Sequence, residues 1–143
     1  MASRGHFEIF QTLAKKHNDT IFVIDEAFID FLSAGRSMID DLLANVIVLR
    51  SMTKFYAIAG IRLGFAVGDE ALIEQIRKYI APWAVNVFAQ EVGVRAIKDK
   101  QYAVNTVETV GHNRQWLYEE LSKLRALYVY PGQANFLLVK LTN

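Results

Sequence analysis

Residues 45–65 read NVIVLRSMTKFYAIAGIRLGF, a continuous apolar run that leads directly into small residues, aromatic residues and a single lysine, Lys54. A similar run, TIFVID, occupies residues 20–25. Short, continuous runs rich in β-branched residues are typical of strands that are covered on both faces of a parallel sheet. We therefore expect both runs to be central strands of an α/β fold.

Helical periodicity and turn residues divide the rest of the chain into elements that suit the same fold class. The spacing of apolar residues over positions 7–14 predicts a first helix, which ends near KHND at residues 16–19. Further elements follow from the same signals: a short helix at 36–44, a strand at 61–68, a helix at 69–82 that Asp69 caps and Pro82 ends, helices at 86–98 and 101–124, and two strands around the Pro-Gly turn at 131–132.

The composition is typical of one compact globular domain and argues against several classes of function. The chain has 143 residues, 52% of them hydrophobic, and a net charge of +1, which provides no strong field for nucleic acid or anionic lipid. It has no cysteine and three scattered histidines, so we expect no metal centre. No apolar run reaches the ~20 residues of a membrane span, and the first residues lack a signal-peptide core, so we expect a cytoplasmic protein with no membrane partner.

Lys54 raises the question of why a lysine follows an apolar strand so closely. A buried ammonium is costly unless it is paired or loses its proton. Two ordinary explanations are that Lys54 lies on an exposed turn, or that its aliphatic stem extends to water. A third explanation is a ligand site, because open parallel sheets bind ligands at the carboxyl ends of their strands.

The residues at those strand ends suit one cofactor. Asp25 follows the first strand, Ser51 and Lys54 follow the second, and Arg62 lies eight residues beyond the lysine. Pyridoxal 5'-phosphate (PLP) has an aldehyde that condenses with a lysine amine, a ring nitrogen that favours a carboxylate, and a phosphate that favours arginine and serine donors. As an imine Lys54 would be neutral, which removes the cost of burial.

The segments FVIDEAF (residues 22–28) and SMTKFYAIAGIRLGF (residues 51–65) together resemble the cofactor-binding core of the fold-type I, aspartate-aminotransferase-like PLP enzymes. That family's pattern is Asp-x-Ala-aromatic, then Ser-x-Ser/Thr-Lys, then Gly-x-Arg-x-Gly. The resemblance implies that Lys54 is the Schiff-base lysine and Asp25 the partner of the ring nitrogen, which are the two expected catalytic residues. It also implies that Ala27 packs near the ring and that Ser51 and Arg62 hold the phosphate.

Within this family the chain is most similar to the threonine-phosphate decarboxylases of cobalamin synthesis, also through APWAVN (residues 81–86) and VYPGQANFLLVKL (residues 129–141). Histidinol-phosphate aminotransferases are near relatives. Phe28 stands where most aminotransferases have a tyrosine whose hydroxyl reaches the cofactor, a bond that phenylalanine cannot donate. We therefore expect PLP-dependent decarboxylation of the phosphorylated amino acid L-threonine O-3-phosphate, with a histidinol-phosphate-type aminotransferase as the alternative.

The resemblance also implies parts that these residues do not contain. In this family a phosphate-capping helix, a ring-stacking aromatic residue and an asparagine precede the Asp-x-Ala motif, and an arginine for the substrate carboxylate belongs to a small C-terminal domain. We therefore expect residues 1–143 to be the central part of the three-layer PLP-binding large domain, running toward the small domain at the C-terminal end. Subunits of fold type I share cofactor contacts with their partner, so a homodimer is expected.

Four further residues have both a structural and a functional interpretation. Glu26 follows Asp25 on the strand and therefore points to the opposite side, which favours a structural role. Tyr56 is expected to be a packing residue with a satisfied hydroxyl rather than a cofactor contact. Trp83 and Asn86 either touch the substrate or pack and cap a helix.

Two other classes of protein remain as alternatives. IFVIDE, at residues 21–26, also resembles the strand that carries the Walker B carboxylate of a P-loop ATPase, although the chain contains no GxxxxGK[ST] segment. The chain could also be a non-catalytic α/β fragment or interaction module that keeps the motif residues without the chemistry. An absorbance scan with added PLP distinguishes this last alternative from an enzyme.

Overall fold

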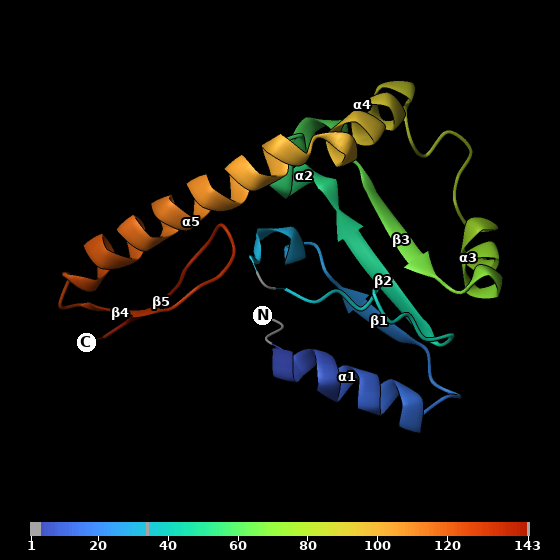
Figure 1. Ribbon diagram of the computed structural model, residues 1–143, viewed down its shortest axis with the longest axis horizontal. Helices are drawn as coiled ribbons and strands as arrows, with labels where there is room; N and C mark the ends of the chain where they lie inside the picture. The colour runs from blue at the N-terminus through green and yellow to red at the C-terminus, as the bar shows by residue number, and fades with distance from the viewer. Residues whose placement is uncertain (1–3, 34, 143) are drawn as a thin grey trace.

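The computed structural model describes residues 4–33 and 35–142, which form a three-stranded sheet and a separate two-stranded sheet with helices around them (Figure 1). The elements in chain order are α1 (Arg4–Lys16), β1 (Phe22–Asp25), η1 (Ile29–Phe31), β2 (Val46–Ser51), α2 (Met52–Phe55), η2 (Ala59–Ile61), β3 (Gly64–Gly68), α3 (Glu70–Arg77), α4 (Val87–Lys98), α5 (Lys100–Ser122), β4 (Leu127–Tyr130) and β5 (Leu138–Leu141). Among the described residues, no helix combines the length and the apolar character that crossing a membrane requires.

Strand β2 is the middle strand of the three-stranded sheet. It pairs parallel to β1, with Asp25 opposite Leu49 at the end of the ladder, and antiparallel to β3, with Ser51 opposite Gly64. The α/β class is confirmed, and β2 is central as expected. In the described chain, however, β1 lies at an edge of the sheet, because no described segment pairs with its other side.

Helix α1 covers one face of the sheet and forms the main core with it. Phe7 and Ala14 on α1 are buried together with Val46 and Val48 on β2, both of which are fully buried. Side chains alternate between the two faces of a strand, so Val23 on β1 points away from this core and is 59% exposed. The expectation that both faces would be covered is therefore not met on β1 within the described residues, whereas Ile47 and Val48 on β2, which point to opposite faces, are both buried.

The predicted helix at 36–44 is replaced by turns. The backbone closes a turn here, in which the N–H of Asp40 donates to the Ser37 carbonyl at 3.2 Å, while Glu26 accepts the N–H of Met38 and the Ser37 hydroxyl accepts that of Ile39. Asp40 accepts from the Ser37 N–H in addition. Such local bonds from side chain to backbone compete with helix formation.

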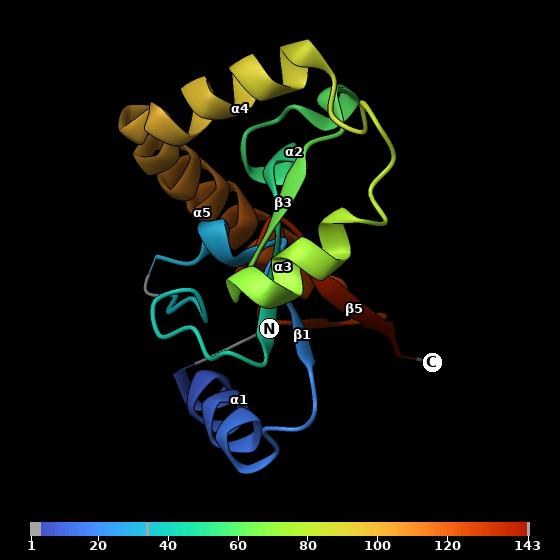
Figure 2. The same ribbon diagram turned by 90° about the vertical axis from the view of Figure 1, so that its right-hand side faces the viewer.

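Two helices begin at side-chain caps near the positions that the sequence indicates. Asp69 accepts a hydrogen bond from the N–H of Ala71 at the start of α3, and Asn86 accepts one from the N–H of Ala89 at the start of α4. Helix α3 ends at Arg77, earlier than the Pro82 stop that we expected. Figure 2 shows α1 and α4 at opposite ends of the three-stranded sheet.

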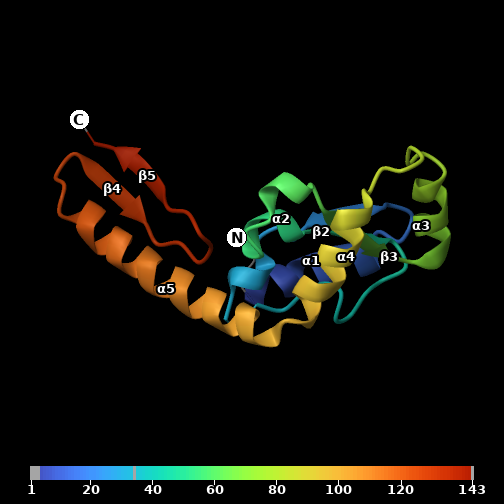
Figure 3. The same ribbon diagram turned by 90° about the horizontal axis from the view of Figure 1, so that it is seen from above.

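Helix α5 links the two sheets. It starts beside α4 near α2 and runs to the β4–β5 hairpin, which Figure 3 shows at the opposite end from α3. The hairpin is antiparallel, with Tyr130 opposite Leu138, and it confirms the two strands expected around the Pro-Gly turn. The residues between β4 and β5 return along α5 toward η1, because Ala134 is fully buried against Phe31.

Candidate active site

The ends of β1 and β2 bring the predicted site residues to one edge of the sheet. Because the two strands are parallel and in register, Asp25 at the end of β1 lies opposite Leu49, two residues before Ser51. The chain then turns into α2, and the N–H of Met52 donates to the carbonyl of Leu63 at 3.2 Å. This bond joins the start of α2 to the segment that precedes β3.

Lys54 lies on the single turn of α2 and forms a small polar group with Ser51 and Thr53. Its Nζ donates to Ser51 Oγ at 3.0 Å, and Ser51 Oγ is 2.9 Å from Thr53 Oγ1. Lys54 is exposed within the described chain, so the cost of a buried ammonium does not arise here. The ordinary explanation of an exposed turn is therefore correct for this chain alone, and the lysine amine is accessible to a ligand.

The Asp25 carboxylate is exposed and held in a fixed orientation by its own turn. Its Oδ1 accepts a hydrogen bond from the N–H of Ala27 at 2.9 Å, the usual geometry by which an aspartate starts a turn. The second carboxylate oxygen, Oδ2, takes no part in this bond. Asp25 is thus a rigid acceptor at the edge of the sheet, and Ala27 follows it directly at the start of the turn.

Arg62 lies between η2 and β3, close to the end of β2. Its backbone is left-handed, with φ of 59°, and its Nη1 donates to the carbonyl of Ala59 at 3.1 Å. Two residues later, Gly64 pairs with Ser51, and a Cβ at Gly64 would lie 2.8 Å from the Arg50 carbonyl oxygen. Only glycine allows this close approach of the two strands, so the Gly-x-Arg-x-Gly spacing keeps Arg62 near the end that carries Ser51.

Phe28 and Phe136 form an aromatic wall beside Lys54. The Nζ of Lys54 lies 5.5 Å from the centroid of the Phe28 ring, within range of a cation–π contact. The Phe28 and Phe136 rings meet edge to face at 5.2 Å. Phe136 was not predicted as a site residue, because more than one hundred residues separate it from Phe28 and no local pattern in the sequence links the two.

Two contacts hold the segment that carries Phe136. Arg114 on α5 donates to the carbonyl oxygens of Gln133 and Ala134 at 3.0 and 3.1 Å, and Ala134 is fully buried. The sequence offered only a weak signal for Phe136, namely its place in the connection that follows the Pro-Gly turn, since binding residues are often on loops. Thr53 was a simpler omission, because it lies inside the same Ser-x-Thr-Lys segment.

A cavity of about 490 Å³ opens beside these residues. Asp25, Phe28 and Phe136 line it together with apolar side chains of α1 and β1. The volume is in the range of sites for small ligands. Glu26 and Arg36 also line the cavity, whereas Lys54, Ser51 and Arg62 do not. The Lys54 amine is near the cavity only through its contact with the Phe28 ring.

The remaining candidates divide clearly. Glu26 is 5% exposed and bonded to its surroundings, which confirms the structural interpretation. Asn86 caps α4, whereas Trp83 has a left-handed backbone and is 95% exposed, so it does not pack against the described chain. Tyr56 stacks on Tyr102 at 5.9 Å, and burial, followed by the nearby Asp30 carboxylate, raises the pKa of its hydroxyl.

Known proteins share both the sequence and the fold of this chain. It is 40% identical over 121 residues to the threonine-phosphate decarboxylase of Salmonella typhimurium, covering 82% of this chain and 33% of that protein. It is 35% identical over 134 residues to histidinol-phosphate aminotransferase 2 of Archaeoglobus fulgidus, covering 93% of this chain and 38% of that one. The chain thus spans about a third of the length of these curated relatives.

Among solved structures, the histidinol-phosphate aminotransferase from Clostridium acetobutylicum superimposes on the whole chain with a TM-score of 0.89 at 29% identity, and the match covers 44% of that protein. The histidinol-phosphate aminotransferase from Sinorhizobium meliloti, solved in complex with pyridoxal-5'-phosphate, shares the fold with a TM-score of 0.82 over 94% of this chain and 38% of its own, at 21% identity. The sequence model of the family described as "Aminotransferase class I and II" matches residues 1–143. The chain therefore belongs to the aminotransferase class I and II family.

Proposed function

We propose that this chain provides the lysine-bearing part of a PLP site, and that the complete enzyme that contains it decarboxylates L-threonine O-3-phosphate. The observation that carries the proposal is the 3.0 Å bond from Lys54 Nζ to Ser51 Oγ, at the same sheet edge as Asp25. Because the chain belongs to the aminotransferase family, the alternative that residues 21–26 are the Walker B strand of a P-loop ATPase has no support.

The side chains present fit the chemistry of PLP, the cofactor of this family. The exposed Lys54 amine suits the aldehyde, and the exposed Asp25 carboxylate suits a protonated ring nitrogen. The Ser51 hydroxyl and the Arg62 guanidinium are the donors that a phosphate favours. Each group lies at the edge where the parallel strands end, the usual position for a ligand on an open α/β sheet.

The residues of this chain have distinct roles in the proposed reaction. When bound, PLP supplies the electron sink that lets a bond at the substrate α-carbon break. Asp25, oriented by its bond to Ala27, keeps a proton on the ring nitrogen. Lys54 anchors the cofactor and afterwards delivers a proton to the substrate carbon. Ser51 accepts a hydrogen bond from the free Lys54 amine and so orients it.

Phe28 supports decarboxylation over transamination. Its ring lies 5.5 Å from Lys54 Nζ and has no hydroxyl with which to bind the phenolic oxygen of PLP. Most aminotransferases have a tyrosine at this position, so a phenylalanine here favours decarboxylation. A histidinol-phosphate-type aminotransferase is the second candidate, since one such enzyme is 35% identical to the chain over 134 residues and another shares its fold with a TM-score of 0.89.

We further propose that residues 1–143 are the central part of a large PLP-binding domain and that the complete enzyme is a homodimer. The length relative to the curated relatives supports this proposal. On its own the chain then binds PLP weakly and has no turnover, because each missing charge-assisted hydrogen bond is worth about 1.5–3 kcal/mol of cofactor affinity. Exposed apolar side chains such as Val23 favour self-association of the isolated chain.

The cofactor assignment is tested on the 143-residue chain itself. PLP is titrated, the complex is reduced with borohydride, and the modified lysine is identified by mass spectrometry of peptides. We expect Lys54 to be labelled at lower PLP concentrations than Lys78, which directly follows α3. Lys54→Ala should remove this preference, while Lys78→Ala keeps it. Equal labelling of the two lysines would contradict the assignment.

The reaction is tested on the complete enzyme that contains this chain. With L-threonine O-3-phosphate we expect release of carbon dioxide without consumption of 2-oxoglutarate. Lys54→Ala should lower turnover by more than about a thousandfold, because loss of a covalent catalyst costs at least that much. Consumption of 2-oxoglutarate with histidinol phosphate would instead establish the aminotransferase.

A further inference from the structure

A cluster of charged and polar side chains, of which Glu26 is buried and the others are partly exposed, lies next to the candidate site along the chain. It consists of Glu26, Asp30, Ser37 and Arg50, and is called the Arg50 cluster here. Glu26 accepts the N–H of Met38 on Oε1 at 2.7 Å and the hydroxyl of Ser37 on Oε2 at 2.6 Å. Arg50 reaches the same Oε2 with Nη1 at 3.4 Å and pairs with Asp30 through Nη2.

The cluster lies where the backbone ladder between β1 and β2 stops. The last bond of that ladder runs from the N–H of Glu26 to the carbonyl of Leu49 at 2.9 Å. Beyond this bond the backbone after β1 leads into η1, and the backbone after β2 leads into α2. No further backbone bond of the ladder therefore joins the segments that follow β1 and β2. The Arg50 side chain spans this gap and binds carboxylates from both Glu26 and η1.

Each end of this bridge is a covalent neighbour of a site residue. Glu26 directly follows Asp25, and Arg50 directly precedes Ser51. The Ser51 hydroxyl in turn accepts a hydrogen bond from the Lys54 ammonium. Side chains alternate along a strand, so the cluster and the exposed Asp25 carboxylate project to opposite sides of the same backbone. A shift of the bridge therefore moves the two halves of the site relative to each other.

The energetics of the cluster argue against a role in stability alone. Glu26 and Arg50 have side chains that are 3% and 15% exposed, and a buried ion pair of this kind seldom stabilises a fold more than apolar side chains of similar size. Within the described residues, Arg50 Nε is buried without a hydrogen-bond partner, which adds to the cost. An arginine that pairs with two carboxylates nevertheless fixes the distance and the angle between the segments that carry them, here the end of β1 with η1 and the end of β2.

We infer that the Arg50 cluster is a positioning device that sets the placement of Asp25 relative to Lys54, and so the affinity of the site for PLP. This inference rests on the proposed function. Arg50, Glu26 and Asp30 act through their neighbours and do not touch the cofactor themselves.

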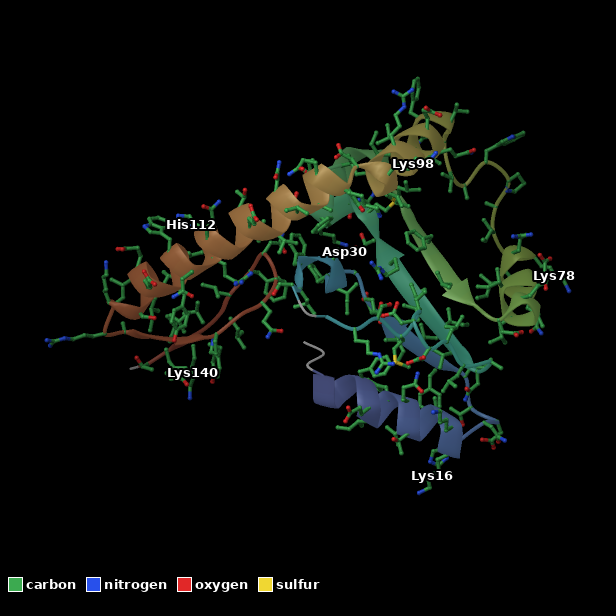
Figure 4. The ribbon with its side chains drawn as sticks, in the orientation of Figure 1. Lys16, Asp30, Lys78, Lys98, His112 and Lys140 are labelled. Carbon is green, nitrogen blue, oxygen red and sulfur yellow. The ribbon has the colours of Figure 1, made fainter. Side chains whose placement is uncertain are left out.

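The test measures the PLP concentration that half-saturates labelling of Lys54 in the 143-residue chain, by borohydride reduction and peptide mass spectrometry. Lys78 and Lys140 serve as internal standards, since both lie far from Asp30 (Figure 4). Arg50→Met should raise the half-saturating concentration for Lys54 about tenfold and leave the two standards unchanged. Arg77→Met, which breaks an exposed pair with Glu74 on α3, is the matched control and should change none of the three.

Two conservative variants separate positioning from folding. Glu26→Gln keeps an oxygen that accepts the N–H of Met38 but loses the charge that holds Arg50, whereas Glu26→Ala loses both. Asp30→Asn removes only the second ion pair, at a side chain that is 27% exposed. We expect Glu26→Gln and Asp30→Asn to weaken Lys54 labelling at least threefold at temperatures where circular dichroism shows the chain fully folded.

The outcomes distinguish this inference from the proposed function. If the unmodified chain labels Lys54 no better than Lys78, the PLP site itself is wrong, and the inference falls with it. If Lys54 is preferred but Asp30→Asn and Glu26→Gln leave its half-saturation within twofold of the unmodified chain, the cluster is only structural and the proposed function stands. Should Arg50→Met fail to fold, these two variants decide.

Discussion

The two ends of strand β2 differ sharply in their surroundings. Val46, Ile47 and Val48 at its start are 0%, 7% and 0% exposed, under α1 on one face. Leu49 is 40% exposed, and Arg50 and Ser51 at the end are partly exposed and bonded to polar side chains. One strand thus stabilises the fold at one end and presents chemistry at the other, which allows the site to change with little cost to the core.

The largest expected effect breaks the buried end. Val48→Asp places an unpaired carboxylate at a fully buried position and should lower the free energy of unfolding by about 4 kcal/mol or more. Val23→Asp is the matched control on the opposite face, where the side chain is 59% exposed, and should cost about 1 kcal/mol or less. Urea denaturation followed by circular dichroism measures both; similar losses would show that the second face is also covered in solution.

The next effect probes the close approach of β3 to the site end. Gly64→Ala places a Cβ 2.8 Å from the Arg50 carbonyl oxygen, so the strands must separate, and we expect a loss of about 1–3 kcal/mol of unfolding free energy. Gly60→Ala meets nothing within 4 Å and should be close to neutral. The same denaturation assay compares them, and a neutral Gly64→Ala would contradict the tight pairing of β2 with β3.

Substitution of Asp25 should have a smaller effect on the free energy of unfolding and a large effect on PLP binding. Asp25→Ala removes the bond to the Ala27 N–H and should cost about 1 kcal/mol of unfolding free energy. It should also raise the PLP concentration that half-saturates Lys54 labelling by about 10–100-fold, since a charge-assisted bond to the ring is lost. Some labelling persists, because Lys54 remains.

Asp69→Ala is the control for that prediction. Asp69 makes the same kind of bond, to the N–H of Ala71, but at the start of α3. We expect a similar loss of stability with no change in PLP labelling. If Asp25→Ala labels Lys54 as readily as the unmodified chain does, another acid holds the ring nitrogen, and the buried Glu26 would be examined first.

The smallest effect concerns Tyr56, two residues beyond Lys54. Burial and the Asp30 carboxylate raise the pKa of its hydroxyl above the ordinary value of about 10. The folded state therefore keeps this proton after the unfolded chain has lost it, so the contribution to stability is constant below pH ~10 and declines as the pH rises through the raised pKa. Tyr56→Phe should remove this part of the alkaline decline, measured by denaturation between pH 9 and pH 11.

Tyr79→Phe is the control for the alkaline decline, because Tyr79 is 90% exposed just beyond the end of α3. We expect it to keep the pH dependence of the unmodified chain. An identical decline in the Tyr56→Phe chain would mean that Tyr56 is not the residue responsible.

The sequence alone was sufficient where the signal is local. The runs at 20–25 and 45–50 predicted β1 and β2, because continuous β-branched segments bounded by turns have few other stable forms. The helix cap at Asp69 was equally readable, since a cap depends on its neighbours within one turn. The family was predicted from two short motifs and is confirmed.

Tertiary structure decided what depends on partners distant in the chain. The region 36–44 was expected to form a short helix, yet its start is fixed by the buried Glu26, which accepts the N–H of Met38, and nothing within that region signals this. Phe136 reaches Phe28 only because Arg114 and the burial of Ala134 bring its segment back along α5. The Arg50 bridge likewise requires the parallel register of β1 and β2. Local propensity acts over one turn or one strand, whereas such long-range contacts form only once the whole chain has found its packing.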